Sequence, residues 1–215
     1  MTNLQSIFEV EIRCRFSEPD EAFAVLPFLA PCLGREISWV TRYYGEALFR
    51  SGQLLRMTEV NEHGKMGYYL GWKGRDTGVF ANIRLEVDEE ITVGVTNSPV
   101  IRRLGGSVGR LTTANVTQEL QRLGHREFMS FRGSDLTGYD EQLDLKVKLM
   151  TCPTLKWPLL VELEKTAYSE QEAIRCEREL LELSRGLQLQ DRLVKEEPPT
   201  LLYEGQSRQS PWRNS

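Results

Sequence analysis

Two pairs of glutamates, each separated by a single residue, are the side chains of this sequence best suited to chemistry. Glu9 and Glu11 lie near the start of the chain, and Glu162 and Glu164 lie far downstream. Both pairs sit in stretches where apolar residues alternate with polar ones, so in a strand both members of a pair face the same side. Neighbouring carboxylates repel each other unless a cation neutralises them. Two such pairs brought together would form an oxygen-rich site suited to Mg²⁺ or Mn²⁺.

Basic side chains occupy alternating positions in several of the other expected strands. Guanidinium groups bind phosphate oxygens in bidentate fashion, and a lysine adds a point charge. Surface charge, or structural pairing with glutamates, is the alternative for each of them. The candidates for phosphate binding are Arg13, Arg56, Lys73, Arg84 and Arg132.

These side chains need a sheet to position them, and the alternation predicts one. Strands are expected over roughly residues 7–16, 39–44, 53–60, 68–74, 79–91, 128–132, 143–149 and 159–165. Helices are expected at 18–30, 117–123 and 169–186, the last beginning with a capping box of Ser169 and Glu172. The Gly-, Ser-, Thr- and Asn-rich segment 94–116 gives no clear element.

Several of these strands carry charges of both signs on one face and apolar residues on the other. A sheet with one solvated face would have this pattern. The alternative is a barrel whose apolar outside is covered by the helices and whose charged interior holds water, metal and an anionic ligand, since buried charges without partners are costly.

Length and composition narrow the possible classes. The 215 residues fit one domain, expected over 1–203, with a disordered tail over 204–215. A net charge of −4 gives no overall attraction to nucleic acid or to a membrane. No apolar run would span a bilayer, no secretory signal is recognisable, and the four cysteines are scattered, so we expect free thiols in a cytoplasmic protein. With only two histidines, a His-based metal site is not expected.

The order of the motifs resembles that of the CYTH family, named for class IV adenylyl cyclase and thiamine triphosphatase and part of the triphosphate tunnel metalloenzymes. The sequence has E-x-E-x-basic, then Tyr-Tyr, Leu-Arg, a strand ending in Lys-Gly, Arg-x-Glu and a late Glu-x-Glu. The match runs from Phe8 to about Tyr203. The resemblance implies an α+β fold, an antiparallel eight-stranded closed β-barrel with flanking helices, which binds triphosphates with a divalent metal.

Residue by residue, the resemblance assigns the two acidic pairs to catalysis and metal binding. Asp144 resembles the aspartate of the penultimate strand, as a metal or water ligand or as a salt-bridge partner of Lys146. The two acidic pairs are Glu9 with Glu11 and Glu162 with Glu164. The positions that the resemblance assigns to phosphate binding are Arg13 (where the family usually has Lys), Arg56, Lys73, Arg84 and Arg132.

Three departures from the family pattern bear on the substrate. Thr58 stands where a second arginine is expected, and Ser130 stands where a lysine is expected. The segments 94–116 and 149–158 are longer than in compact members.

These features predict a hydrolase that uses Mg²⁺ or Mn²⁺ to cleave inorganic triphosphate, thiamine triphosphate or a nucleoside triphosphate. Adenylate cyclase activity on the same scaffold is one alternative, and a module that binds a triphosphate without turnover is another. The expected partner is a small-molecule triphosphate, with neither DNA nor membrane. An RNA 5′ end is a weaker candidate because no extended basic face is recognisable. Whether the chain forms a homodimer is left open by the sequence.

Overall fold

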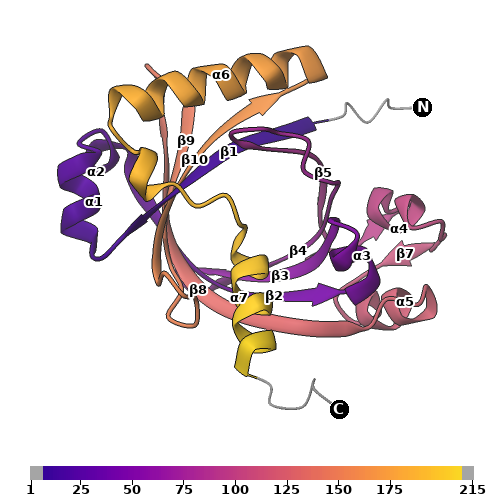
Figure 1. Cartoon of the computed structure of the whole chain (residues 1–215). Helices are drawn as coiled ribbons and strands as arrows, with labels where there is room; N and C mark the ends of the chain where they lie inside the picture. The colour runs from indigo at the N-terminus through magenta and orange to yellow at the C-terminus, as the bar shows by residue number, and fades with distance from the viewer. Residues whose placement is uncertain (1–6, 210–215) are drawn as a thin grey trace.

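Eight antiparallel strands close into a barrel in the computed structural model, which describes the backbone of residues 7–209 and the side chains of residues 7–205. Figure 1 looks along the barrel. The order around the barrel is β1-β10-β9-β8-β2-β3-β4-β5, with β5 pairing back to β1. Their bounds are β1 Ile7–Phe16, β2 Leu33–Tyr44, β3 Leu54–Glu62, β4 Lys65–Lys73, β5 Asn82–Glu90, β8 Glu127–Asp140, β9 Leu145–Thr151 and β10 Leu159–Ala167. The predicted closed eight-stranded barrel is confirmed.

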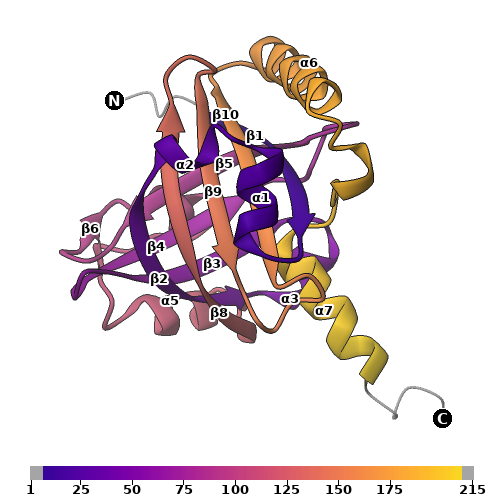
Figure 2. The same cartoon turned by 90° about the vertical axis from the view of Figure 1, so that its left-hand side faces the viewer.

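Alternation in β1 shows why the chain folds this way. Val10, Ile12 and Cys14 are buried on the outer side of β1, in one core cluster with residues of α1 (Pro19–Val25) and α6 (Glu170–Gly186). The intervening residues of β1 face the barrel interior. Figure 2 shows α1 and α6 against this side of the barrel. Covering the outside with helices removes the apolar face from water, which is the main favourable contribution to folding.

Helix α6 has the predicted limits and start. The Ser169 side chain accepts a hydrogen bond from the Glu172 backbone N–H, as the capping box requires. By contrast, the single helix expected over 18–30 is two short helices, α1 and α2 (Leu29–Cys32). Pro27 lies between them, and a proline disfavours helical backbone in the residue before it.

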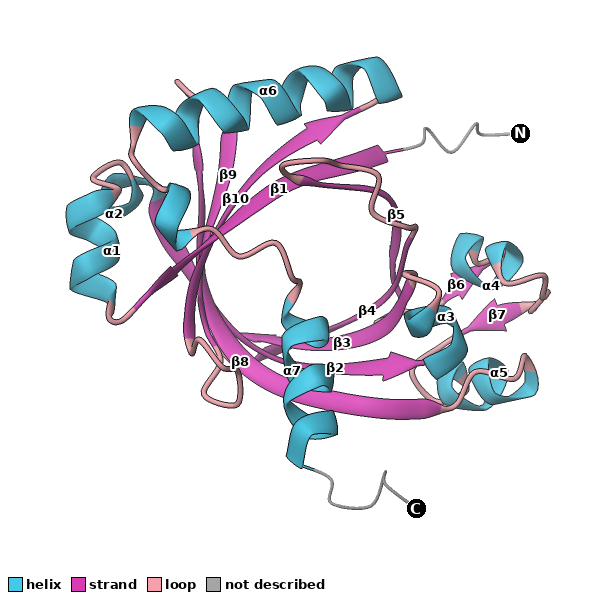
Figure 3. Ribbon diagram, in the orientation of Figure 1, coloured by secondary structure: helices cyan, strands magenta, loops and turns pink. Residues whose placement is uncertain are grey.

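The segment without a clear prediction forms a small layer outside β4 and β5. It contains β6 (Val95–Thr96), α4 (Pro99–Arg103) and β7 (Arg110–Leu111), and α5 (Val116–Arg122) follows. Its apolar side chains form a separate core with residues of β3, β4 and the end of β2. Helix α3 (Glu46–Arg50) lies beside this layer in Figure 3.

The C-terminal part of the described chain crosses one mouth of the barrel. After the short helix η1 (Gln190–Arg192), the chain reaches α7 (Pro198–Gln209), which lies across the barrel opening in Figures 1 and 3. Helix α7 takes in the first residues of the predicted disordered tail, and residues 210–215 lie outside the described residues. Within the described part of the chain no helix is long and apolar enough to span a membrane. All four cysteines are free, as predicted.

Candidate active site

The barrel encloses a charged tunnel with a cavity of about 390 Å³. Inward-facing side chains of all eight strands line it, together with three residues of the C-terminal segment, Glu197, Pro198 and Pro199. The sheet with one solvated face is therefore excluded, and the predicted charged interior is present. Glu9, Glu11, Glu162 and Glu164 all face this cavity, as do Arg13, Arg56 and Lys73.

The tunnel has two ends that differ in exposure. At the closed end, which α7 covers, the side chains of Arg13, Glu162, Glu197 and Arg84 are only 2–10% exposed. At the open end the side chains of Lys146 and Asp88 are 54% and 42% exposed. The terms closed end and open end are used in this sense below.

Arg13 is the central cation of the closed end. Its Nε donates to Glu162 Oε1 at 2.7 Å, its Nη1 donates to Asn82 Oδ1 at 2.8 Å, and its Nη2 contacts Glu11. Burial opposes its charge, yet the carboxylates of Glu162 and Glu197 raise the Arg13 pKa above its usual value. The strand register explains the pairing, because Arg13 and Glu162 are directly opposite on β1 and β10.

Glu162 is held ionised by two cations. Lys148 Nζ lies 2.5 Å from Glu162 Oε2, on the side away from Arg13. Burial would raise the pKa of Glu162, but Lys148 and Arg13 outweigh it and lower that pKa to about 2. Glu162 is thus a fixed negative charge at any pH near neutrality.

Glu9 and Glu86 form a coupled carboxyl pair near Lys73. Lys73 Nζ is 2.5 Å from Glu9 Oε1 and 3.5 Å from Glu86 Oε1. Burial of Glu86, countered by Lys73 and reinforced by the Glu9 charge, raises the Glu86 pKa to about 9, whereas Lys73 outweighs burial and keeps the Glu9 pKa well below its usual value. Each carboxylate therefore disfavours ionisation of the other, and Glu86 is the member of the pair that takes up a proton more readily.

Arg56 lies between this pair and the open end. Its Nη2 contacts Glu86 Oε1 at 2.8 Å and Asp88 Oδ2 at 3.1 Å. Gly71, on the neighbouring strand, makes room for this arrangement, because a Cβ there would collide with the Asp88 carboxylate and crowd Arg56 Nε. Thr58 occupies the next inward position on β3 and hydrogen bonds with Thr41, so no second arginine lies here.

At the open end, Glu164 accepts a hydrogen bond from Lys146 Nζ at 2.6 Å. Burial and the nearby negative charge of Glu9 raise the pKa of Glu164. Glu164 is thus destabilised as an anion by a second carboxylate, although the two lie on different strands.

The donor set fits a divalent cation by its chemistry. No group of three or more His, Cys, Asp or Glu side chains is already arranged to hold a metal among residues 7–205. However, the Glu9 charge raises the pKa values of both Glu86 and Glu164, and a divalent cation bound by these carboxylates would relieve that repulsion. Glu11 and Glu162, also predicted as metal ligands, are instead engaged by Arg13.

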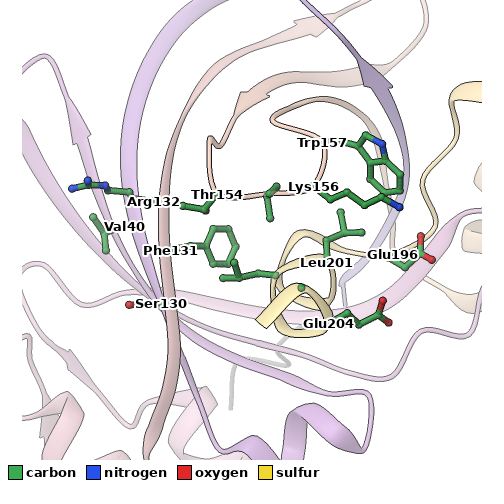
Figure 4. Close-up of a pocket in the computed structure, with 13 residues that line it drawn as sticks. Val40, Ser130, Phe131, Arg132, Thr154, Lys156, Trp157, Glu196, Leu201 and Glu204 are labelled. Carbon is green, nitrogen blue, oxygen red and sulfur yellow. The ribbon is translucent and has the colours of Figure 1, made fainter. Parts of the chain in front are cut away.

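Two predicted site residues lie outside the tunnel. Arg132 is exposed on the outer side of β8, and Phe131 faces the tunnel in its place, so the inward face predicted for this strand was wrong. Arg132 and Ser130 line a separate cavity of about 920 Å³ between β8, the loop 154–157 and α7, where Figure 4 shows Arg132 pointing away from Leu201. The reason is local packing, because Phe131 stacks on Tyr43 with ring centroids 5.7 Å apart and joins an apolar cluster with α7.

Asp144 is the other correction. It lies in the turn before β9, at a φ of 48°, and its carboxylate accepts a hydrogen bond from the Tyr139 hydroxyl. Strand β9 begins only at Leu145, so the alternation that brings Lys146 and Lys148 into the tunnel does not extend to Asp144. Asp144 does not line the tunnel, and Lys146 pairs with Glu164 rather than with Asp144.

Arg84 faces inward but binds mostly backbone. Its Nη1 donates to Gly52 O at 2.7 Å and contacts Gly74 O, and its Nε lies 3.0 Å from Glu197 Oε1. Its charge is thus directed to the closed end, and its role in phosphate binding stays a prediction.

Four acidic residues of the tunnel were not among the predicted site residues. Glu86 and Asp88 had a usable signal, because they alternate with Arg84 on one strand. Asp135 had none, since it follows Arg132 in a Gly-Ser-Asp stretch typical of a loop, and Glu197 belongs to a Glu-Glu-Pro-Pro stretch with no strand pattern. Burial raises the pKa of Asp135 to about 6.

Proteins with a similar fold are found among solved structures. No family model matches the sequence, and no curated protein matches it either. Among solved structures, a Pyrococcus horikoshii protein aligns with a TM-score of 0.70 at 18% identity, covering 92% of this chain and 99% of that one. A Vibrio parahaemolyticus protein named as a candidate adenylate cyclase aligns with a TM-score of 0.67 at 14% identity, covering 93% of this chain and 99% of that one.

The fold is CYTH-like. A third solved structure, from Hippeastrum, aligns with a TM-score of 0.56 at 15% identity and covers 92% of this chain and 96% of that one. That protein is described as a candidate adenylyl cyclase with a dominant triphosphatase activity. At these identities the likeness concerns the CYTH-like fold alone, and the chemistry of this chain has to be argued from its own tunnel.

Proposed function

We propose that this chain is a divalent-metal-dependent triphosphatase whose substrate enters the tunnel from the open end. The observation that carries the proposal is the convergence of basic and acidic side chains from seven of the eight strands in one closed barrel. A purely structural barrel interior would be apolar, because buried charges cost free energy unless they are paired or bind a ligand. The triphosphatase activity described for the Hippeastrum protein of the same fold supports this choice.

In this proposal the basic residues hold the phosphate chain. Arg56, Lys73 and Lys148 line the tunnel on three different strands and would bind non-bridging oxygens, while Arg13 keeps Glu162 and Glu11 in place. Transfer of a phosphoryl group has a loose transition state, so fixed charges around the chain supply most of the rate enhancement.

Glu9, Glu86 and Glu164 would hold the Mg²⁺ or Mn²⁺ ion, which would neutralise phosphate charge and lower the pKa of a bound water. Glu164 would also accept a hydrogen bond from the attacking water, because it is the member of this group nearest the exposed Lys146. A cation held there would favour the ionised form of Glu86, so cation binding should become stronger as the pH rises.

A second candidate is a module that binds triphosphates without turnover. It is favoured by one observation, which is that five basic side chains of the tunnel each have a carboxylate partner within 4 Å: Arg13, Arg56, Lys73, Lys146 and Lys148. A ligand would have to compete with those carboxylates, which suits weak or regulated binding.

A substrate screen decides between these candidates. Purified protein is incubated with inorganic triphosphate, thiamine triphosphate and nucleoside triphosphates, with Mg²⁺ or Mn²⁺, while phosphate, pyrophosphate and cyclic nucleotide are measured. Release of phosphate supports the triphosphatase, and pyrophosphate with cyclic nucleotide would instead identify a cyclase. Binding by calorimetry with no product would identify the binding module, and neither binding nor product would refute the proposal.

A further inference from the structure

The carboxylate of Glu197 enters the closed end of the tunnel from the segment that joins η1 to α7. Glu197 is only 4% exposed, and its Oε1 lies 3.0 Å from Arg84 Nε and 3.7 Å from Arg13 Nη2. Its Oε2 is buried with no hydrogen-bond partner among the described residues. A negative charge from outside the barrel strands thus occupies a position beside two guanidinium groups.

Arg84 is the cation that this carboxylate engages. Its other contacts are the neutral backbone oxygens of Gly52 and Gly74. Within the described residues, Glu197 is the one carboxylate at ion-pair distance from it. The pairing is imperfect, because Arg84 Nε lacks hydrogen-bond geometry to any acceptor. By contrast, Arg13 is already occupied by Glu162, so the charge of Arg84 is the one available to a different anion.

The segment that carries Glu197 is fastened on both sides. Before it, the Val194 backbone N–H donates to Arg13 O at 2.9 Å. After it, the Tyr203 hydroxyl donates to Glu46 Oε1 at 2.7 Å, and the Tyr203 ring packs on Phe49 with centroids 5.0 Å apart. The carboxylate is therefore held at a fixed depth, with Pro198 beside it in the tunnel wall.

We propose that Glu197 determines the length of phosphate chain that the tunnel accepts. This inference rests on the proposed function, in which a linear phosphate chain enters through the open end. The leading phosphate of a longer chain would meet the Glu197 carboxylate before it reached Arg84. The two anions would then repel each other. Without the carboxylate charge, Arg84 would be free to bind one more phosphate by charge-assisted hydrogen bonds.

The test compares inorganic triphosphate with inorganic tetraphosphate as ligands of the full chain. Affinities are measured by calorimetry with Mg²⁺ for the wild type, for Glu197→Gln and for the matched control Glu196→Gln. Glu196 is the exposed neighbouring residue and lines the outer cavity of Figure 4, so its substitution removes the same charge from the same segment without changing the tunnel. Thermal unfolding of each variant verifies that it is folded.

The expected result is a change in the ratio of the two affinities. Glu197→Gln should bind tetraphosphate about tenfold more tightly than the wild type does, the effect of one charge-assisted hydrogen bond, while its affinity for triphosphate changes less and Glu196→Gln matches the wild type. If the wild type binds triphosphate and Glu197→Gln has the same ratio, this inference is overturned and the proposed function stands. If neither protein binds either ligand, both fall.

A second variant covers the case in which Glu197→Gln does not fold. Glu197→Asp keeps the charge and withdraws it by one methylene, which should give a smaller gain for tetraphosphate in the same direction. An unchanged ratio in Glu197→Asp would then overturn the inference.

Discussion

The two ends of the tunnel contain the same kinds of side chain in different surroundings. At the closed end, Arg13 and Glu162 are nearly inaccessible to solvent and are satisfied by several partners each. At the open end, Lys146 and Asp88 are about half exposed, and each has one carboxylate or guanidinium partner. Exposed ion pairs contribute little to stability, whereas breaking a buried pair is costly. The closed end is therefore mainly a structural network, and the open end is the part with freedom to exchange partners for a ligand.

The largest expected effect is on the rate of turnover. Glu9→Gln should lower the rate of phosphate release about a thousandfold because it weakens the site that would hold the cation. Glu162→Gln should lower it by about as much, because Arg13 and Lys148 lose the carboxylate that positions them. The matched control is Glu36→Gln, an exposed position of β2 that faces away from the tunnel, which should keep the wild-type rate. Wild-type rates in both tunnel variants would refute the assignment.

The next effect, on stability, tests the contrast between the ends directly. Arg13→Met should lower the free energy of unfolding by about 3 kcal/mol, because it leaves the buried carboxylates of Glu162 and Glu11 without that partner. Arg56→Met, nearer the open end, should cost about 1 kcal/mol. Urea denaturation of both variants measures the difference, and equal losses would contradict the distinction.

The pH dependence of the free energy of unfolding is a further test, through the buried carboxyl group of Asp135. The pKa of Asp135 is raised in the folded state to about 6 from its usual 3.8, so the folded state binds more protons than the unfolded state between these values. The contribution of Asp135 therefore becomes less favourable as the pH rises through this window. Asp135→Asn should be more stable than the wild type by up to about 3 kcal/mol above pH 6, with no advantage below pH 3.8.

Chemical denaturation across pH 3–8 measures this difference for Asp135→Asn. Asp144→Asn is the control, since that carboxylate lies on an exposed turn outside the tunnel. A constant difference between Asp135→Asn and the wild type at all pH values would rule out titration of Asp135 as its origin.

The smallest expected effect is at Arg132. Because Arg132 points away from the tunnel, Arg132→Ala should change kcat/KM for a triphosphate by less than about twofold, whereas Lys148→Ala should lower it by at least tenfold. Steady-state kinetics on both variants provide the measurement. A large loss in Arg132→Ala would mean that substrate also contacts the outer cavity.

The sequence predicted correctly the features that depend on local alternation, and it failed where contacts between distant parts of the chain decide the structure. Local alternation is strong in β1 and β10, so the inward positions of Glu9 and Glu164 were predicted correctly. In β8 the alternation of Phe131 and Arg132 was also recognised, but period two does not tell which face is inward. That choice is made by Tyr43 and the apolar residues of α7, which lie far away in the sequence.

Glu197 illustrates the limit more sharply. Nothing in its local sequence distinguishes it from Glu196, yet one is buried between arginines and the other is exposed. The difference arises from where η1 and α7 anchor the segment. The prediction for Asp144 failed for a related reason, since Asp144 itself has a positive φ in the turn and the alternation of β9 begins only at Leu145.

The pairing of β1 with β10 has a consequence for how the protein is made. Arg13 and Glu162 are 149 residues apart, so the first strand leaves the ribosome long before its neighbour on that side exists. Contacts of such long range are formed late and slowly. During synthesis the unpaired, partly apolar edge of β1 can therefore associate with other nascent chains. The yield of folded protein should fall in cells with reduced chaperone capacity.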